Sequence, residues 1–355
     1  MKKALLEFLQ TDNELYAFLV TPKAFQVFTL PVRKIEIISV VQGIRNFHLN
    51  RGSQISGILM KEVQAFSMDA FMELGRRIFS PELQNALADI GGLYIVPYQD
   101  LHYLPLHAMP FGTGYLIDHM EVAYLPAASL LPYLSRRPEH RPEMQRFLGV
   151  GVDAYDLNGA FNREVSHIRD VQIWTDGSIK LLRGKEANKV AVLSHLAQFQ
   201  IIHFSTHGYF SARDPLESGL LLYTDEEQFQ VQERERTDLI LSAYDLRRLK
   251  LTAELVTMSG CVTGQSEHHP GDELLGLSRS LLFSGAKGMI LSLFASFKAV
   301  TAHPETHFGV FYRYWIGDGM TRSAAFRAYI LRIKSEPAFA HPLFWFPYIY
   351  IGSID

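Results

Sequence analysis

The stretch Ile201-Ile202-His203-Phe204-Ser205-Thr206-His207-Gly208 decides the fold, together with the later run Leu255-Val256-Thr257-Met258-Ser259-Gly260-Cys261. Both are short apolar and β-branched runs that stop at glycine, which is typical of parallel strands buried between two layers of helices. A reactive side chain follows each run, His207 in the first and Cys261 in the second. Because ligands bind outside the carboxyl ends of strands in open α/β sheets, these residues are candidates for a base and a nucleophile.

Similar runs recur outward from this stretch. Strands are predicted at residues 146–152, 179–182, 200–205, 254–259, 288–294 and near 345–351, with helices between them. This alternation predicts a doubly wound α/β sheet. Ser242, with Asp245 three residues later, predicts the capped start of one helix.

The beginning of the chain follows a different pattern. Strands at residues 5–9, 15–21 and 25–30, separated by turn residues, predict a β-meander, and helices are predicted at residues 33–48 and 62–79. Residues 136–142 combine two prolines with dense charge and mark the predicted boundary. We expect a smaller α+β N-terminal subdomain at residues 1–140 and an α/β domain at residues 141–355.

Composition limits the classes of function. The 355-residue chain is 48% hydrophobic and carries a formal net charge of −3, so it offers no basic surface for nucleic acid or an anionic membrane. No run approaches the roughly 18 apolar residues of a membrane span. The single cysteine excludes an internal disulfide and fits a reducing compartment. The sequence therefore predicts a cytoplasmic protein without nucleic-acid or membrane partners.

The pair of His207 and Cys261 suggests nucleophilic chemistry. A free thiol has a pKa near 8.5, and His207 can either lower that pKa as an imidazolium or take the proton as a general base. The backbone N–H groups of Gly208 and Cys261 are candidates for an oxyanion hole.

Other motifs are weaker. His203 lies within a predicted strand and is expected to be a hydrogen-bonded core residue. His303 and His307 are four residues apart and would share a face of a helix, but no third metal ligand is evident. The segment from Gly149 to Ala154 matches a dinucleotide fingerprint but lacks the acid that should end the next strand. We expect no metal and no cofactor.

Seven segments, in this order, make the chain from about Leu83 to Gly352 resemble the CHAT family, peptidase-like domains of the caspase and separase clan. They lie at residues 93–105, 124–130, 203–208, 214–220, 241–246, 259–264 and 271–277. The 54 residues between His207 and Cys261 are also close to the roughly 50-residue spacing of caspase-type peptidases.

The resemblance implies a caspase-like α/β/α sandwich with a mostly parallel central sheet. It also implies a catalytic dyad, mapped onto His207 and Cys261, that cleaves a protein substrate through an acyl-enzyme without metal or organic cofactor. Family members are commonly linked to tetratricopeptide or other sensor modules and serve in bacterial signalling or defence. The expected function is thus a cysteine endopeptidase controlled by a separately encoded partner.

The substrate pocket is less defined. Four acids near the expected edge could favour a basic residue before the cleaved bond: Asp153, Asp156, Asp214 and Asp272. An apolar pocket lined by Phe294 or Phe297 is equally open. The segment 294–301 departs from the family pattern, so substrate preference does not carry over.

A second function remains open. The same sheet edge in a catalytically silent, caspase-like interaction module would bind a partner peptide, although the aromatic residues near the C-terminus are expected to be core. The N-terminal meander could extend the sheet, form a degenerate second half, or provide a docking surface.

Overall fold

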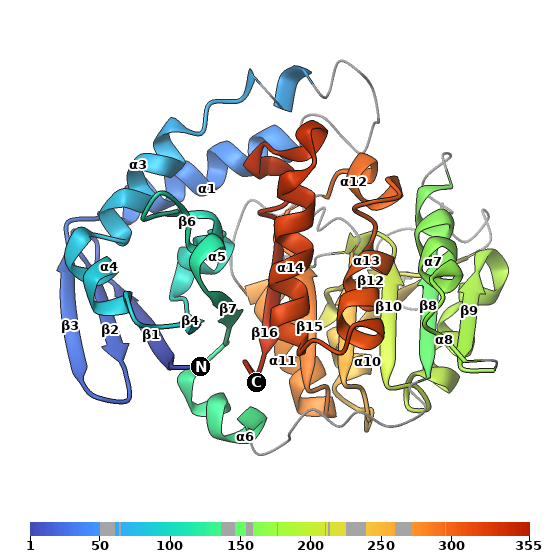
Figure 1. Ribbon diagram of the computed structural model, residues 1–355. Helices are drawn as coiled ribbons and strands as arrows, with labels where there is room; N and C mark the ends of the chain where they lie inside the picture. The colour runs from blue at the N-terminus through green and yellow to red at the C-terminus, as the bar shows by residue number, and fades with distance from the viewer. Residues whose placement is uncertain are drawn as a thin grey trace.

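One continuous sheet organises the molecule. The computed structural model describes residues 1–49, 61–63, 65–135, 146–153, 159–175, 177–209, 211, 214–224, 239–259, 272–294 and 296–355. Within them an 11-stranded sheet has the order β3-β2-β1-β4-β7-β16-β15-β14-β10-β8-β9, and helices flank it (Figure 1). The predicted α/β class with a mostly parallel central sheet is confirmed.

Five parallel strands form one side of this sheet. They are β8 (Phe147–Gly151), β9 (Ile179–Arg183), β10 (Ile201–Ser205), β14 (Leu255–Met258) and β15 (Gly288–Ser292). In space they lie in the order β9-β8-β10-β14-β15. From β8 the chain goes outward to β9 on one side, and from β10 it goes to β14 and β15 on the other side, so the direction changes between β8 and β10. In doubly wound folds this switch point is where ligands bind, at the carboxyl ends of the strands.

Helices cover both faces of the five strands. On one side α7 (Ala160–Asp170) packs against α12 (Lys298–Ala302) and α13 (Phe308–Tyr312), and α13 packs against α14 (Arg322–Ser335); α13 and α14 lie in front of the sheet in Figure 1. On the other side lie α8 (Lys189–Leu196), α10 (Ala243–Leu246) and α11 (Asp272–Ser284), with Lys189 paired to Asp245 at 2.7 Å. The predicted capping box of Ser242 and Asp245 starts α10.

The N-terminal meander extends the sheet. Its strands are β1 (Lys3–Gln10), β2 (Leu15–Val20) and β3 (Phe25–Leu30), and β1 pairs in parallel with β4 (Gly92–Val96). Through β7 (Glu121–Tyr124) and β16 (Tyr348–Gly352) the sheet continues to β15. The sheet-extension alternative is therefore the one that the structure shows. Residues 136–145 lie outside the described part, so the two-part domain division stays a prediction.

Further helices and strands lie along the described part of the chain. The N-terminal helices are α1 (Lys34–Leu49), α3 (Asp69–Ile78) and α4 (Pro81–Leu87). The single helix predicted over residues 62–79 is interrupted at residues 66–68, and its last part is α3, which ends at Ile78. Ser80 then caps α4, whose first residue is Pro81, a residue well suited to the first position of a helix. The remaining elements are β5 (Pro110–Phe111), β6 (Gly114–Tyr115), α5 (Leu116–His119), α6 (Leu131–Ser135), β11 (Gly208–Tyr209), β12 (Gly219–Leu221) and β13 (Ile240–Ser242).

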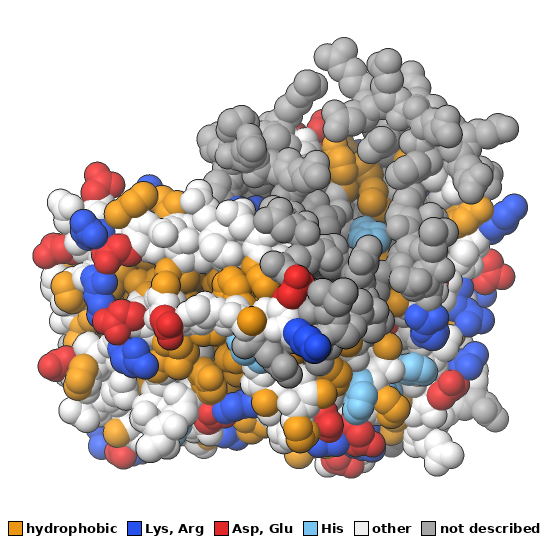
Figure 2. Space-filling view, turned by 90° about the horizontal axis from the view of Figure 1, so that it is seen from above, with side chains coloured by type: hydrophobic (Ala, Val, Ile, Leu, Met, Phe, Trp, Pro, Cys, Tyr) orange, Lys and Arg blue, Asp and Glu red, His pale blue; other side chains and the backbone are white. Residues whose placement is uncertain are grey.

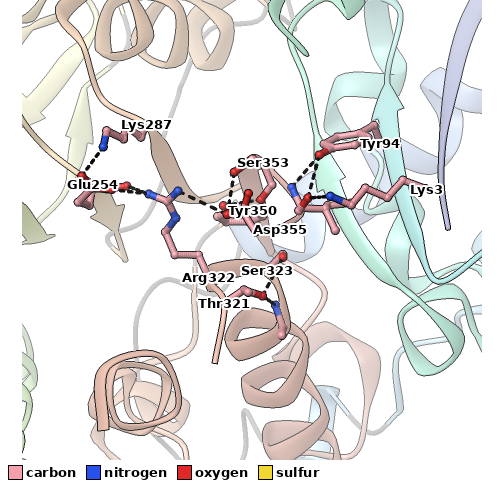
Figure 3. Close-up of polar contacts among 12 residues, drawn as sticks. Lys3, Tyr94, Glu254, Lys287, Thr321, Arg322, Ser323, Tyr350, Ser353 and Asp355 are labelled. Carbon is pink, nitrogen blue, oxygen red and sulfur yellow. Dashed lines mark hydrogen bonds and ion pairs between the residues drawn. The ribbon is translucent and has the colours of Figure 1, made fainter. Parts of the chain in front are cut away.

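A buried ion cluster holds the amino ends of β14 and β15 against α14 (Figure 3). Glu254 is 3% exposed and Arg322 is fully buried. Arg322 Nη1 donates to the backbone oxygen of Glu254 and lies 3.2 Å from its carboxylate, which also pairs with Lys287. Arg322 also lies 3.8 Å from the Asp355 carboxylate. The guanidinium therefore joins α14, β14 and the C-terminal segment.

The same C-terminal segment contacts the N-terminal strands. The Ile354 N–H donates to the Tyr94 hydroxyl at 2.8 Å, and Lys3 Nζ donates to the Ile354 carbonyl (Figure 3). Residues from β1, β4 and the end of β16 thus meet at one point, which links the meander to the rest of the sheet.

We predict that Arg322→Met destabilises the protein by about 3 kcal/mol, because it leaves a buried carboxylate with one of its two cationic partners removed. Urea unfolding followed by circular dichroism measures this change. The matched control is Arg332→Met at the more exposed ion pair with Glu305, where a change of at most about 1 kcal/mol is expected. Equal losses for the two variants would contradict the assigned role of Arg322.

Candidate active site

Backbone hydrogen bonds align the carboxyl ends of three strands. The Val152 N–H donates to the Ser205 carbonyl at 3.1 Å, and the Ser259 N–H donates to the Phe204 carbonyl at 3.0 Å. One strand further, Ser296 Oγ donates to the Ser259 carbonyl at 2.8 Å. The pairing therefore continues past the strand ends, and the residues that follow β8, β10 and β14 leave from one edge of the sheet.

His207 lies at this edge, two residues after β10. Its carbonyl accepts the Leu221 N–H at 2.8 Å, and the next residue, Gly208, begins β11. The imidazole is half-buried and meets the Phe161 ring of α7 edge to face, with centroids 4.9 Å apart and planes at 85°. Figure 2 views the molecule from above, from the side of this edge, and hydrophobic side chains and histidines are visible on the right half of that view. Backbone and ring of His207 are both held.

The surroundings of His207 affect its protonation. Burial lowers the pKa of the imidazole below its ordinary value of about 6.5, because the charged form loses hydration. A neutral imidazole at neutral pH can accept a proton. Of the two roles open to His207, this environment favours the general base over a permanent imidazolium.

The position of Cys261 lies outside the described residues. Ser259, two residues earlier, is buried and hydrogen-bonded to β10, so the chain that leads to Cys261 starts beside the chain that leads to His207. The assignments of Cys261 as nucleophile, and of the Gly208 and Cys261 amides as oxyanion hole, stay predictions.

The four candidate substrate-binding acids differ. Asp153 uses both carboxylate oxygens on the amino end of α7, accepting the N–H groups of Phe161 at 2.9 Å and Asn162 at 3.1 Å. Asp214 is exposed and accepts the Leu216 N–H at 2.9 Å. Asp156 and the side chain of Asp272 lie outside the described part. The hydrogen bonds of Asp153 give it a clear structural role, and contact of any of these acids with substrate stays a prediction.

The alternative apolar pocket is filled by the protein itself. Phe294 and Phe297 are 3% and 7% exposed, and their ring centroids lie 5.4 and 5.3 Å from the His48 ring of α1. The C-terminal aromatic residues are core as predicted: Phe339, Phe344, Trp345, Phe346, Tyr348 and Tyr350 are all buried. Phe294 and Phe297 therefore face the interior.

Sequence analysis did not single out Glu164 of α7. The residue is 2% exposed and lies in the apolar stripe of the helix with Phe161, Val165 and Ile168. Its carboxylate contacts Ser205 and His203 of β10. An acid inside an apolar helical stripe is the sequence signal that could have identified it, since carboxylates are rarely buried unless paired.

Helix α13 begins only at Phe308. His307 caps it, with Nδ1 accepting the Gly309 N–H at 3.0 Å, whereas His303 follows the end of α12. The two histidines therefore do not share a helical face. Among the described residues, no group of three or more His, Cys, Asp or Glu side chains is placed to hold a metal ion. The helices described also include none long and apolar enough to cross a membrane.

The strand order and the two layers of helices define a caspase-like α/β domain. The chain belongs to the CHAT domain family, whose family model matches residues 69–353.

Two proteins with similar sequences are much longer than this chain, which spans about 8% of their length. The chain is 26% identical over 196 residues to human tetratricopeptide repeat protein 28 and 26% identical over 201 residues to the mouse protein; each match covers 48% of this chain and 8% of the relative.

Two crystal structures of the Saccharomyces cerevisiae separase–securin complex contain a chain with a similar fold. Their TM-scores are 0.59 and 0.60 at 9% and 11% identity, and each match covers 99% of this chain and 30% of the other. The likeness therefore shows a separase-like fold over nearly the whole chain.

We predict that the imidazole of His207 titrates with a midpoint below pH 6.5 in the isolated protein, because burial disfavours its charged form. Two-dimensional NMR of the histidine ring signals, assigned with His207→Gln, measures this midpoint. A midpoint above pH 6.5 would show that a negative group stabilises the imidazolium, and would favour a thiolate–imidazolium pair instead.

Proposed function

We propose that this protein is a cysteine endopeptidase of the CHAT type that cleaves a protein substrate with a His207 and Cys261 dyad. The observation that carries the proposal is the half-buried imidazole of His207, just past the carboxyl end of β10, the middle one of the five parallel strands. The neighbouring strand, β14, leads to the only cysteine of the chain. Nucleophile and base on adjacent strand ends suit acyl transfer.

The chemistry follows from this pair. His207 takes the proton of the Cys261 thiol while sulfur attacks the scissile carbonyl carbon, and the amides of Gly208 and Cys261 are proposed to stabilise the oxyanion. The imidazolium then protonates the leaving amine and a thioester remains. Water attacks the thioester as His207 takes its proton, which releases the new carboxyl end and restores the thiol. No cofactor takes part in these steps.

A catalytically silent module that binds a partner peptide is the second candidate. The exposed apolar face of the meander favours binding of a partner, whereas the held and desolvated imidazole favours catalysis. Substrate cleavage separates the two candidates.

The partner part of the proposal rests on the outer face of the meander. Leu9, Val20, Phe25 and Val27 are 40%, 44%, 65% and 51% exposed, whereas the opposite face joins the hydrophobic core. Val20 pairs with Phe25 across β2 and β3, and the Phe18 and Phe25 rings stack at 6.4 Å. The meander is antiparallel, and such a sheet can leave one face in water, but that face is then normally polar; the apolar side chains gathered here suit a docked protein.

The proposed partner is a separately encoded sensor, such as a tetratricopeptide-type helical module, because helices can pack apolar side chains onto this face. The name of the curated relatives, tetratricopeptide repeat protein 28, supports a module of the tetratricopeptide type. Resemblance to CHAT proteins supports a bacterial signalling or defence pathway, and the single free cysteine supports the cytoplasm as its location.

We predict that Cys261→Ala and His207→Ala each reduce cleavage at least about 1000-fold, because each removes one half of the dyad. The protein is co-expressed with the products of its neighbouring genes, and every product is read by intact mass. A clip that persists at the wild-type rate in the Cys261→Ala protein would refute the proposed nucleophile. Stable association with no clip from any version would favour the binding module.

We also predict that the double variant Phe25→Lys/Val27→Lys loses co-purification with the partner, because two charges in an apolar interface must be desolvated. The matched control is Val190→Lys on α8, where the native side chain is 80% exposed. Thermal unfolding checks that both variants fold. Unchanged binding by the folded double variant would show that the partner docks elsewhere.

A further inference from the structure

A chain of buried hydrogen bonds lies beneath the candidate site. Ser205 Oγ donates to Glu164 Oε2 at 2.7 Å, and His203 Nε2 lies 3.1 Å from Glu164 Oε1. His203 Nδ1 is 3.0 Å from the Tyr312 hydroxyl, which is 2.9 Å from Thr257 Oγ1. The chain therefore connects β10 with three of its neighbours, α7, α13 and β14.

The members of this chain are sealed from solvent. Glu164 is 2% exposed, and His203, Ser205, Thr257 and Tyr312 are fully buried. A buried carboxylate is costly unless hydrogen-bonded, and here it is bonded on both oxygens to one strand. Burial raises the pKa of the Tyr312 hydroxyl, with Glu164 adding to the shift, so this hydroxyl keeps its proton. The hydrogen bonds therefore fix the geometry of the chain, and the Tyr312 hydroxyl stays protonated.

Helix α7 reaches His207 as well as this chain. Phe161, one helical turn before Glu164, forms the edge-to-face contact with the His207 ring. On β10, Ser205 precedes His207 by two residues. Through Phe161 and Glu164, one face of α7 thus contacts His203, Ser205 and His207, which are alternate residues of one segment.

The sequence provides for this close approach. At Gly151 of β8 a Cβ atom would lie 2.8 Å from Asn162 Oδ1 and 3.2 Å from Asn162 Cα, so only glycine lets α7 come this near to the sheet. Asp153 holds the first turn of the same helix. These contacts place the Glu164 carboxylate within hydrogen-bond distance of a strand beyond β8.

We infer that Glu164 is a positioning residue for His207, an inference that rests on the proposed role of His207 as the base. Its two hydrogen bonds lock the last part of β10 onto α7, so that the imidazole meets Phe161 in one orientation. Glu164 touches neither substrate nor reacting atoms in this role. Its removal should weaken catalysis by loosening the base.

A second buried carboxylate provides a matched comparison. Glu254 lies at the opposite, amino end of β14, is 3% exposed, and is paired with Arg322 and Lys287. Both acids hold a helix on the same sheet, but only Glu164 bonds to the strand that leads to the proposed base. A general loss of stability should follow from changing either acid, whereas a loss of catalytic rate should follow from Glu164 alone.

The test compares Glu164→Gln, Ser205→Ala and Glu254→Gln in the full chain, with substrate and partner present if activity needs them. After titration of active sites with a thiol-directed inhibitor, Glu164→Gln should lower kcat per active molecule at least about tenfold, while KM changes less than about threefold, since misplacement of a catalytic group costs up to about 100-fold. Ser205→Ala, which removes one of the two hydrogen bonds and keeps the carboxylate and its contact with His203, should fold even where Glu164→Gln does not, and should lower kcat several-fold. Glu254→Gln should lower the unfolding temperature with kcat unchanged.

An NMR readout keeps the test independent of activity. Nuclear Overhauser contacts between the His207 and Phe161 rings should weaken in Glu164→Gln and Ser205→Ala and persist in Glu254→Gln. Wild-type kcat and unchanged ring contacts in both site variants would overturn the inference, as would an equal kcat loss in Glu254→Gln. A folded wild-type protein that cleaves nothing would overturn the proposed function, and the ring contacts alone would then decide the positioning role.

Discussion

The two-sided parallel pairing of β10 is the constraint on which the rest of the site depends. β10 pairs residue by residue with β8 on one side and with β14 on the other, and every one of its residues is buried. Such a strand cannot shift register by one residue, because the shift would turn His203 and Ser205 from one layer of helices to the other. The position of His207 along the chain is thereby fixed by the interior of the sheet.

The sheet has buried carboxylates at both of its edges, and they are neutralised differently. Glu254 faces two cations, so its position is maintained by strong and poorly directional attraction that joins α14 to the C-terminal segment. Glu164 faces an imidazole and a hydroxyl, whose hydrogen bonds depend on angle as well as distance. The first arrangement suits joining elements, and the second suits fixing the orientation of a strand end.

Most of the fold could be predicted from the sequence because its strands are short, apolar and ended by glycine or turn residues. The order of strands and the extension of the sheet by the meander could not, since pairing between β1 and β4 joins residues about ninety positions apart without a local signal. Asp153 illustrates a further limit. An acid just past a strand end predicts a ligand contact and a helix cap equally well, and only the position of α7 shows that its oxygens meet two helical N–H groups.

A candidate site can be predicted from the sequence only as far as single residues carry chemistry. A histidine and a cysteine near predicted strand ends can be recognised by residue type alone, whereas Glu164 acts through neighbours that are about forty residues away in sequence. The position of Glu164 bears on whether His207 acts as a general base or as a permanent imidazolium. The proposed base, His207, is half-buried, held by its backbone and packed against the Phe161 ring, so its orientation does not depend on a carboxylate bonded to the imidazole itself. The acid lies one layer deeper instead, where it bonds to the strand and leaves the imidazole with its pKa lowered by burial, a state suited to accepting the thiol proton at neutral pH.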